Sequence, residues 1–61
     1  IDKEVIEDTL KNPDNVVDGK KGRKIAHKIM GNKLLRVIYE ENKKVYIVIT
    51  CYYTQPKRYI K

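Results

Sequence analysis

The chain has 61 residues, of which 41% are hydrophobic and 36% charged, and its formal net charge is +6 at pH 7. This length allows one domain with a thin core, because a chain of this size buries only about 60% of the surface that it exposes when unfolded. The longest apolar stretch, residues 45–53, is far shorter than the roughly 20 residues that cross a bilayer, and a single cysteine excludes an internal disulfide. We therefore expect one cytoplasmic domain, residues 1–61, that makes no membrane contact and gains stability from a homodimer or another partner.

The charge is divided unevenly along the chain. Residues 1–18 carry six acidic and two basic side chains, a net charge of −4, whereas residues 19–61 carry twelve basic and two acidic ones, a net charge of +10. All five tyrosines lie in the basic part. Lysine and arginine release counterions from phosphates, and tyrosine rings stack on unpaired bases, so the basic part is typical of a nucleic-acid surface. A basic face that is only solvated is the alternative.

The first predicted element is a short helix over residues 3–11. Asp2 is a suitable N-cap, and Glu4 in the first turn complements the helix dipole. The proline at position 13 cannot continue the helix, so residues 12–14 end it. The apolar stripe that should face a sheet consists of Val5, Ile6, Thr9 and Leu10.

Two strands are predicted over residues 23–30 and 33–40, after a brief extended piece at Val16-Val17 and a turn. They flank Gly31-Asn32, which suits a two-residue hairpin turn. The turn sets the cross-strand pairs, which are His27 with Arg36, Ile25 with Ile38, and Ile29 with Leu34.

A third strand is predicted over residues 44–53, after a three-residue loop that places Glu40 opposite Lys44 and Arg36 opposite Val48. One face of this sheet is apolar and should pack on the helix, and it carries Ala26, Leu35, Val37, Tyr39, Val45, Ile47, Ile49, Cys51 and Tyr53. The other face mixes apolar residues with polar ones: Ile25, Ile29, Leu34, Ile38 and Val48 with His27, Arg36, Tyr46, Thr50 and Tyr52. Such a mixed surface indicates a binding site or a face that another element covers.

The predicted fold is therefore α+β, with an N-terminal helix packed on a twisted antiparallel sheet of three main strands. A short basic tail or helix should follow Gln55-Pro56. A thiol nucleophile at Cys51, partnered by His27, is an alternative to a reduced, buried cysteine.

Several short motifs of this chain together resemble the small toxin domains of the BrnT-like and RelE-like type, including related domains of unassigned function. After the first helix these motifs are Asn12-Pro13-Asp14 with Val16-Val17, Gly22-Arg23-Lys24-Ile25, Leu34-Leu35-Arg36-Val37-Ile38-Tyr39-Glu40, and Val48-Ile49-Thr50-Cys51-Tyr52 before a basic tail. Where BrnT-like chains tend to have an arginine near the end of the last long strand, this chain has Tyr52.

The resemblance implies the toxin of a toxin–antitoxin system: a metal-independent endoribonuclease that cuts messenger RNA, in many members on the ribosome, and that a cognate antitoxin protein neutralises. It also implies an upstream strand that carries a histidine, so we expect a missing N-terminal element before Ile1. Arg58 and Tyr59 fall in a tail where the superfamily commonly places basic and tyrosine residues.

A metal-free ribonuclease needs a base for the 2′-hydroxyl, an acid for the leaving 5′-oxygen and cations for the phosphorane. His27 is the candidate base, Arg36 the candidate phosphate clamp, and Arg58 and Tyr59 complete the catalytic set. The candidate RNA-binding residues are Arg23, Lys24, Tyr46, Tyr52 and Lys57. One histidine and one cysteine do not make a zinc site, and no cofactor is expected.

Each of these residues also has a structural interpretation. His27 is then a strand residue packed beside Arg36, Arg36 pairs with an acid such as Glu40, and the tyrosines cover sheet surface. The alternative function is a non-catalytic basic module of the same fold that binds RNA or a protein.

Overall fold

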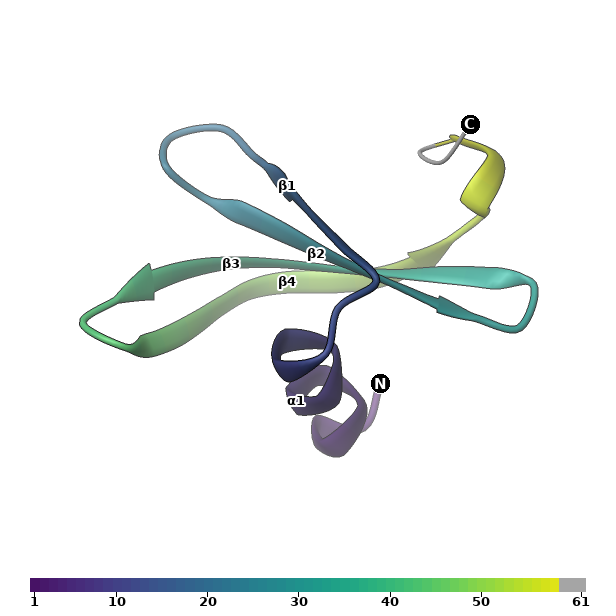
Figure 1. Ribbon diagram of the computed structural model, residues 1–61, viewed down its shortest axis with the longest axis horizontal. Coiled ribbons are helices and arrows are strands. Elements are labelled where there is room, and N and C mark those ends of the chain that lie inside the picture. The colour runs from purple at the N-terminus through teal and green to yellow at the C-terminus, as the bar shows by residue number, and fades with distance from the viewer. Residues whose placement is uncertain (59–61) are drawn as a thin grey trace.

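A computed structural model describes residues 1–58 of the chain, without the side chain of Arg58 (Figure 1). One helix lies below a strongly twisted sheet, and a short 3₁₀ helix follows the last strand on the other side (Figure 1). The elements in chain order are α1 (Lys3–Lys11), β1 (Asn15–Asp18), β2 (Lys24–Met30), β3 (Lys33–Asn42), β4 (Val45–Thr54) and η1 (Pro56–Arg58).

The fold is α+β, as predicted, but the antiparallel sheet has four strands in the order β1-β2-β3-β4 rather than three. The extra strand is the segment around Val16-Val17, which the sequence showed only as a brief extended piece. It pairs with β2 from Asn15 opposite His27 to Asp18 opposite Lys24. Four residues give too short a hydrophobic pattern to predict a strand, and the free edge of β2 supplies the partner.

Helix α1 has the predicted bounds, and of its predicted stripe Thr9 is buried while Val5, Ile6 and Leu10 are half-buried. Thr9 is fully buried, and its hydroxyl donates a hydrogen bond to the Val5 carbonyl at 2.8 Å. Asp2 occupies the N-cap position in an extended conformation, although its side chain makes no capping hydrogen bond there. Packing of one face, rather than the cap, therefore holds this short helix.

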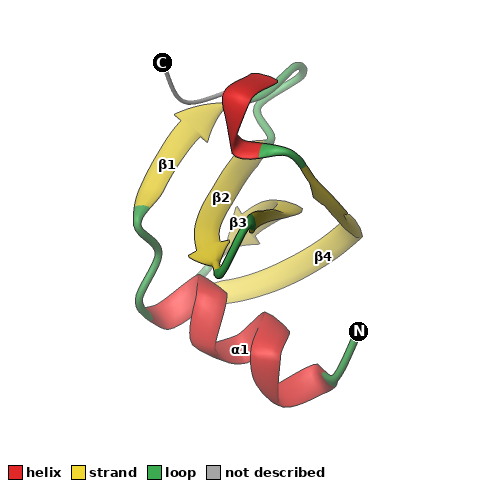
Figure 2. Cartoon of the chain, turned by 90° about the vertical axis from the view of Figure 1, so that its right-hand side faces the viewer, coloured by secondary structure: helices red, strands yellow, loops and turns green. Residues whose placement is uncertain are grey.

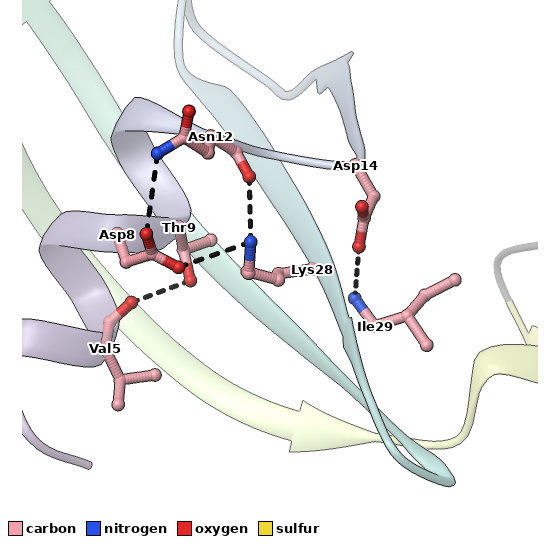
Figure 3. Close-up of polar contacts among 7 residues, drawn as sticks. All are labelled: Val5, Asp8, Thr9, Asn12, Asp14, Lys28 and Ile29. Atoms are coloured by element: carbon pink, nitrogen blue, oxygen red, sulfur yellow. Dashed lines mark hydrogen bonds and ion pairs between the residues drawn. The ribbon is translucent and has the colours of Figure 1, made fainter.

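Polar contacts fasten α1 and the segment after it to β2 (Figure 3). Lys28 Nζ lies 3.2 Å from Asp8 Oδ2 and donates to the Asn12 carbonyl at 3.0 Å. A turn later in the chain, the Asp14 carboxylate accepts a hydrogen bond from the Ile29 N–H at 2.7 Å. These contacts fix the helix beneath β2 and guide the chain into β1.

The β2–β3 hairpin has the predicted register. Its turn is Gly31-Asn32, and Gly31 adopts a positive φ of 65°, which a primed turn requires at its first central position. The three predicted pairs are confirmed, including His27 opposite Arg36.

The predicted register between β3 and β4 is wrong. The turn has two residues, Lys43 and Lys44, both with positive φ (49° and 69°), and it places Asn42 opposite Val45. Glu40 therefore lies opposite Ile47 and not Lys44, while Arg36 lies opposite Tyr52 and not Val48. Non-glycine residues rarely adopt positive φ, so the sequence carried no signal for this tight turn.

A β-bulge shifts the alternation of β4. Ile38 pairs with Thr50 and Tyr39 pairs with Val48, which leaves Ile49 as an extra residue on β4. One extra residue moves the side chains before it to the opposite faces.

Tyr46 accordingly lies on the side of α1, contrary to the prediction. Its ring centroid is 5.1 Å from that of the buried Tyr39, and it lines a surface hollow together with residues of α1. By the same shift, Val45 and Ile47 lie on the opposite face, where the sequence predicted Tyr46.

The core is small and is formed by β2 and β3, on the helix side of the sheet except for Leu34, which is buried on the opposite face. Its buried hydrophobic residues are Ala26, Leu34, Leu35, Val37 and Tyr39. Four residues of β4 that were predicted in the core are at least 40% exposed: Val45, Ile47, Ile49 and Tyr53. Helix α1 packs on β2 and β3, so β4 extends past its cover. Within residues 1–58, no helix has the length and hydropathy to cross a membrane.

Candidate nucleic-acid interface

The sheet face away from α1 is called the far face below. Cross-strand pairs share a face, so the register assigns to it Asn15, Val17, Ile25, His27, Ile29, Leu34, Arg36, Ile38, Glu40, Asn42, Val45, Ile47, Thr50 and Tyr52. His27, Arg36 and Tyr52 meet at its centre.

Arg36 joins two side chains on neighbouring strands. Its Nε donates a hydrogen bond to His27 Nε2 on β2 at 3.1 Å, and its Nη1 donates to the Tyr52 hydroxyl on β4. The guanidinium carbon also lies 5.5 Å from the centroid of the Tyr52 ring, within the range of a cation–π contact. We call these three residues the Arg36 cluster. The predicted contact between His27 and Arg36 is confirmed, and Tyr52 is its third member.

The members of the cluster differ in exposure. His27 is 2% exposed, Arg36 is half-buried, and Tyr52 is 39% exposed. A ligand on the far face therefore meets the phenol and the guanidinium before it meets the imidazole.

His27 is held in its neutral form. Burial lowers the pKa of His27 below the ordinary value of 6.5, and the positive charge of Arg36 lowers this pKa further. Because Nε2 accepts the hydrogen bond from Arg36, the proton of the neutral ring belongs on Nδ1. The Nε2 lone pair, which a general base uses, is thus occupied by Arg36 in this structure.

Two of the predicted RNA-binding cations are paired with acids. Arg23 Nε lies 3.2 Å from Glu40 Oε1, and Lys24 Nζ lies 3.9 Å from Asp18 Oδ1. Glu40 was predicted as an alternative partner of Arg36, but in the structure Glu40 pairs with Arg23. Both pairs are well exposed, so they add little stability, and a phosphate can compete for the cations.

The other described residues of the predicted RNA-binding set are Tyr46 and Lys57. Tyr46 lies on the helix side, and Lys57 is exposed in η1. The side chain of Arg58 and the whole of Tyr59 lie outside the described residues. Of the predicted catalytic set, the structure brings His27 and Arg36 together.

Four lysines lie at one end of the sheet. Lys20 and Lys21 are in the β1–β2 connection, and Lys43 and Lys44 form the β3–β4 turn, which lies at the same end (Figure 1). The doubled lysines were visible in the sequence, but their placement at the same end of the sheet depends on the strand order. They extend the basic surface beyond the Arg36 cluster.

Cys51 does not meet His27. It lies opposite Val37 on the helix side of the sheet, whereas His27 is on the far face. A cysteine nucleophile activated by His27 is therefore incompatible with the register. Among residues 1–58, no group of three or more histidine, cysteine, aspartate or glutamate side chains is placed to hold a metal ion.

Comparison of the chain with protein-family models, curated proteins and solved structures gives no match.

The neutral state of His27 predicts a pH dependence of stability. Unfolded histidine binds its proton near pH 6.5, and the folded state binds it only at lower pH, so acidification from pH 7.5 through the folded pKa favours unfolding. The slope should approach about 1.4 kcal/mol per pH unit inside that window, because one proton is taken up on unfolding. Urea unfolding at pH 7.5, 6.5 and 5.5 measures it.

The control is His27→Gln, which keeps an acceptor for Arg36 but has no proton to bind in this range. His27 is the single histidine of the chain, and carboxylic acids ordinarily titrate about two units lower, so the variant should lose the slope. An equal slope in both proteins would contradict the assignment.

Proposed function

We propose that this protein binds RNA through its far face, with the phosphate backbone seated on Arg36 and a base or ribose against Tyr52. The observation that carries this proposal is the Arg36 cluster: a guanidinium held between a neutral imidazole and an exposed phenol. Neither side chain neutralises the guanidinium, and the phenol offers both a ring for stacking and a hydroxyl for a phosphate oxygen.

The charge of the surrounding chain supports a polyanion rather than a small ligand. Residues 19–61 carry a net charge of +10, and lysines stand at the two hairpin tips at one end of the sheet. The Arg36 cluster spans the middle strands β2 and β3 and the edge strand β4, between that end and Lys57 in η1. A single RNA strand that crosses the far face would contact cations along its length.

A second candidate function is endoribonuclease activity of the toxin type, which the contact between a neutral histidine and Arg36 favours. Phosphate binding would draw the guanidinium away from His27 and free Nε2 to take the proton of the 2′-hydroxyl. The 2′-oxygen would then attack phosphorus, and the bond to the 5′-oxygen would break as that oxygen takes a proton from water. The products are a 2′,3′-cyclic phosphate and a 5′-hydroxyl, and no metal or cofactor takes part.

In this second function the protein would act on messenger RNA, free or on the ribosome, and a cognate antitoxin would restrain it. The sequence resemblance supports these partners. Phosphate-controlled exposure of His27 gives a physical reason why the base would stay inactive until RNA is bound.

RNA binding is tested with Arg36→Gln and the matched control Lys11→Gln, which removes one positive charge from the C-terminal end of α1. Arg36→Gln should weaken the binding of a single-stranded RNA about tenfold or more, because a charge-assisted phosphate contact is lost. It should also reduce the slope of log affinity against log salt by about 0.7, the value for one phosphate contact on a single strand. Lys11→Gln should change neither quantity appreciably.

Fluorescence anisotropy of a labelled RNA over a salt series makes this measurement, with thermal unfolding as a check that both variants fold. An affinity that does not depend on salt, or equal losses in both variants, would count against the interface.

Cleavage is tested separately with wild type and His27→Gln. Wild type should release fragments with 2′,3′-cyclic phosphate ends from a messenger RNA, either in an EDTA-treated reaction or in a translating extract. His27→Gln should slow cleavage about 100-fold or more while RNA affinity stays within a few-fold, because a general base is lost and the contact with Arg36 is kept. Intact RNA in both settings would reject the enzyme and leave the binding function standing.

A further inference from the structure

We propose that β4 is a dimerisation strand, along which two copies of this chain pair antiparallel about a two-fold axis at Ile47. The two four-stranded sheets would then form one continuous sheet. This inference goes beyond RNA binding, since it concerns the outer edge of β4 and not the Arg36 cluster.

The main evidence for this proposal is that β4 is a long apolar strand at the edge of the sheet. Among the described residues it pairs with β3 alone. Its ten residues include no charged residue, no proline and no glycine. The five consecutive apolar residues from Val45 to Ile49 are 39–59% exposed, so both faces of this segment are open as well as its edge.

The opposite edge of the sheet provides an internal contrast. Strand β1 has four residues, and it begins with Asn15 and ends with Asp18. Short length and charge are the usual devices that keep an edge strand from pairing with another chain. Strand β1 carries both devices, whereas β4 has only the bulge at Ile49, at one end of its apolar segment, which indicates that β4 has a partner.

A second copy fits this edge electrostatically although the whole chain has a net charge of +6. With the axis at Ile47, Val45 to Ile49 of one copy pair with the same residues of the other. Lys44 then lies opposite Thr50 of the second copy, and Lys43 lies opposite its Cys51. The two lysine turns end up about 20 Å apart along the ladder, roughly two Debye lengths at physiological salt.

The acidic helix adds charge complementarity. Figure 2 shows α1 crossing beneath the sheet, with its N-terminal end on the side of β4. An axis perpendicular to the joined sheet keeps both helices on one face, so each copy brings Asp2, Glu4 and Glu7 toward the shared edge. The acidic half of α1 in one copy and the Lys43-Lys44 turn of the other then lie along the same shared edge, so opposite charges are brought to it.

The small core makes dimerisation energetically favourable. Helix α1 covers β2 and β3, while the apolar side chains of β4 stay exposed beyond it. A domain of this size buries a small share of its surface, and association of two exposed strands increases that share.

The test compares Ile47→Lys with Val16→Lys by sedimentation equilibrium over a wide range of protein concentrations. The two positions are 45% and 41% exposed on the two opposite edge strands, so the substitutions are matched in exposure and charge. Wild type and Val16→Lys should sediment at twice the chain mass of 7.2 kDa. Ile47→Lys should raise the dissociation constant of the dimer about tenfold or more, because it places like charges opposite each other on the axis.

Two further variants keep the proposal testable if Ile47→Lys unfolds the chain. Ile47→Glu mixed with Ile47→Lys should restore the dimer, because opposite charges then meet across the ladder. Ile47→Cys in a Cys51→Ser background should form an intermolecular disulfide on oxidation, whereas Val16→Cys in the same background should not. A wild-type protein that stays monomeric, or equal dissociation by both lysine variants, would overturn the proposal.

Discussion

The Gly31-Asn32 turn fixes the β2–β3 hairpin, and the other elements are placed relative to that hairpin. Its register buries Ala26 and Val37 as a pair toward α1 and sets His27 against Arg36 on the other face. A slip of one residue would exchange the two faces of the slipped strand and turn His27 or Arg36 toward the helix. The same constraint thus gives the domain both its core and the charged centre of its far face.

The sheet separates three roles in space. Its helix side holds most of the small core, its far face holds the Arg36 cluster, and its β4 edge holds exposed apolar residues. A phosphate drawn to Arg36 and a second copy paired along β4 would meet at Tyr52, which belongs both to the cluster and to the edge strand. RNA binding and dimerisation would therefore both involve the strand that carries Tyr52.

The sequence predicted the parts of the fold that local chemistry determines. Pro13 ends α1, and the glycine at position 31 admits a primed turn, so the bounds of the helix and the pairing of His27 with Arg36 followed from short-range rules. The β3–β4 register could not be predicted in this way, because Lys43 and Lys44 adopt positive φ without glycine and the bulge at Ile49 depends on both strands. The position of Tyr52 beside Arg36 depends on that register, so the sequence alone did not predict Tyr52 as a member of the cluster.

The central claim is that a neutral His27 is joined to Arg36 through Nε2 and that RNA disturbs this contact. Long-range ¹H–¹⁵N correlation spectra of the single histidine test it directly, at pH 7, with and without a single-stranded RNA. We expect a neutral ring with its proton on Nδ1, and a change of the Nε2 resonance when RNA is added. A protonated ring in the free protein, or an Nε2 resonance that RNA leaves unchanged at saturation, would contradict it.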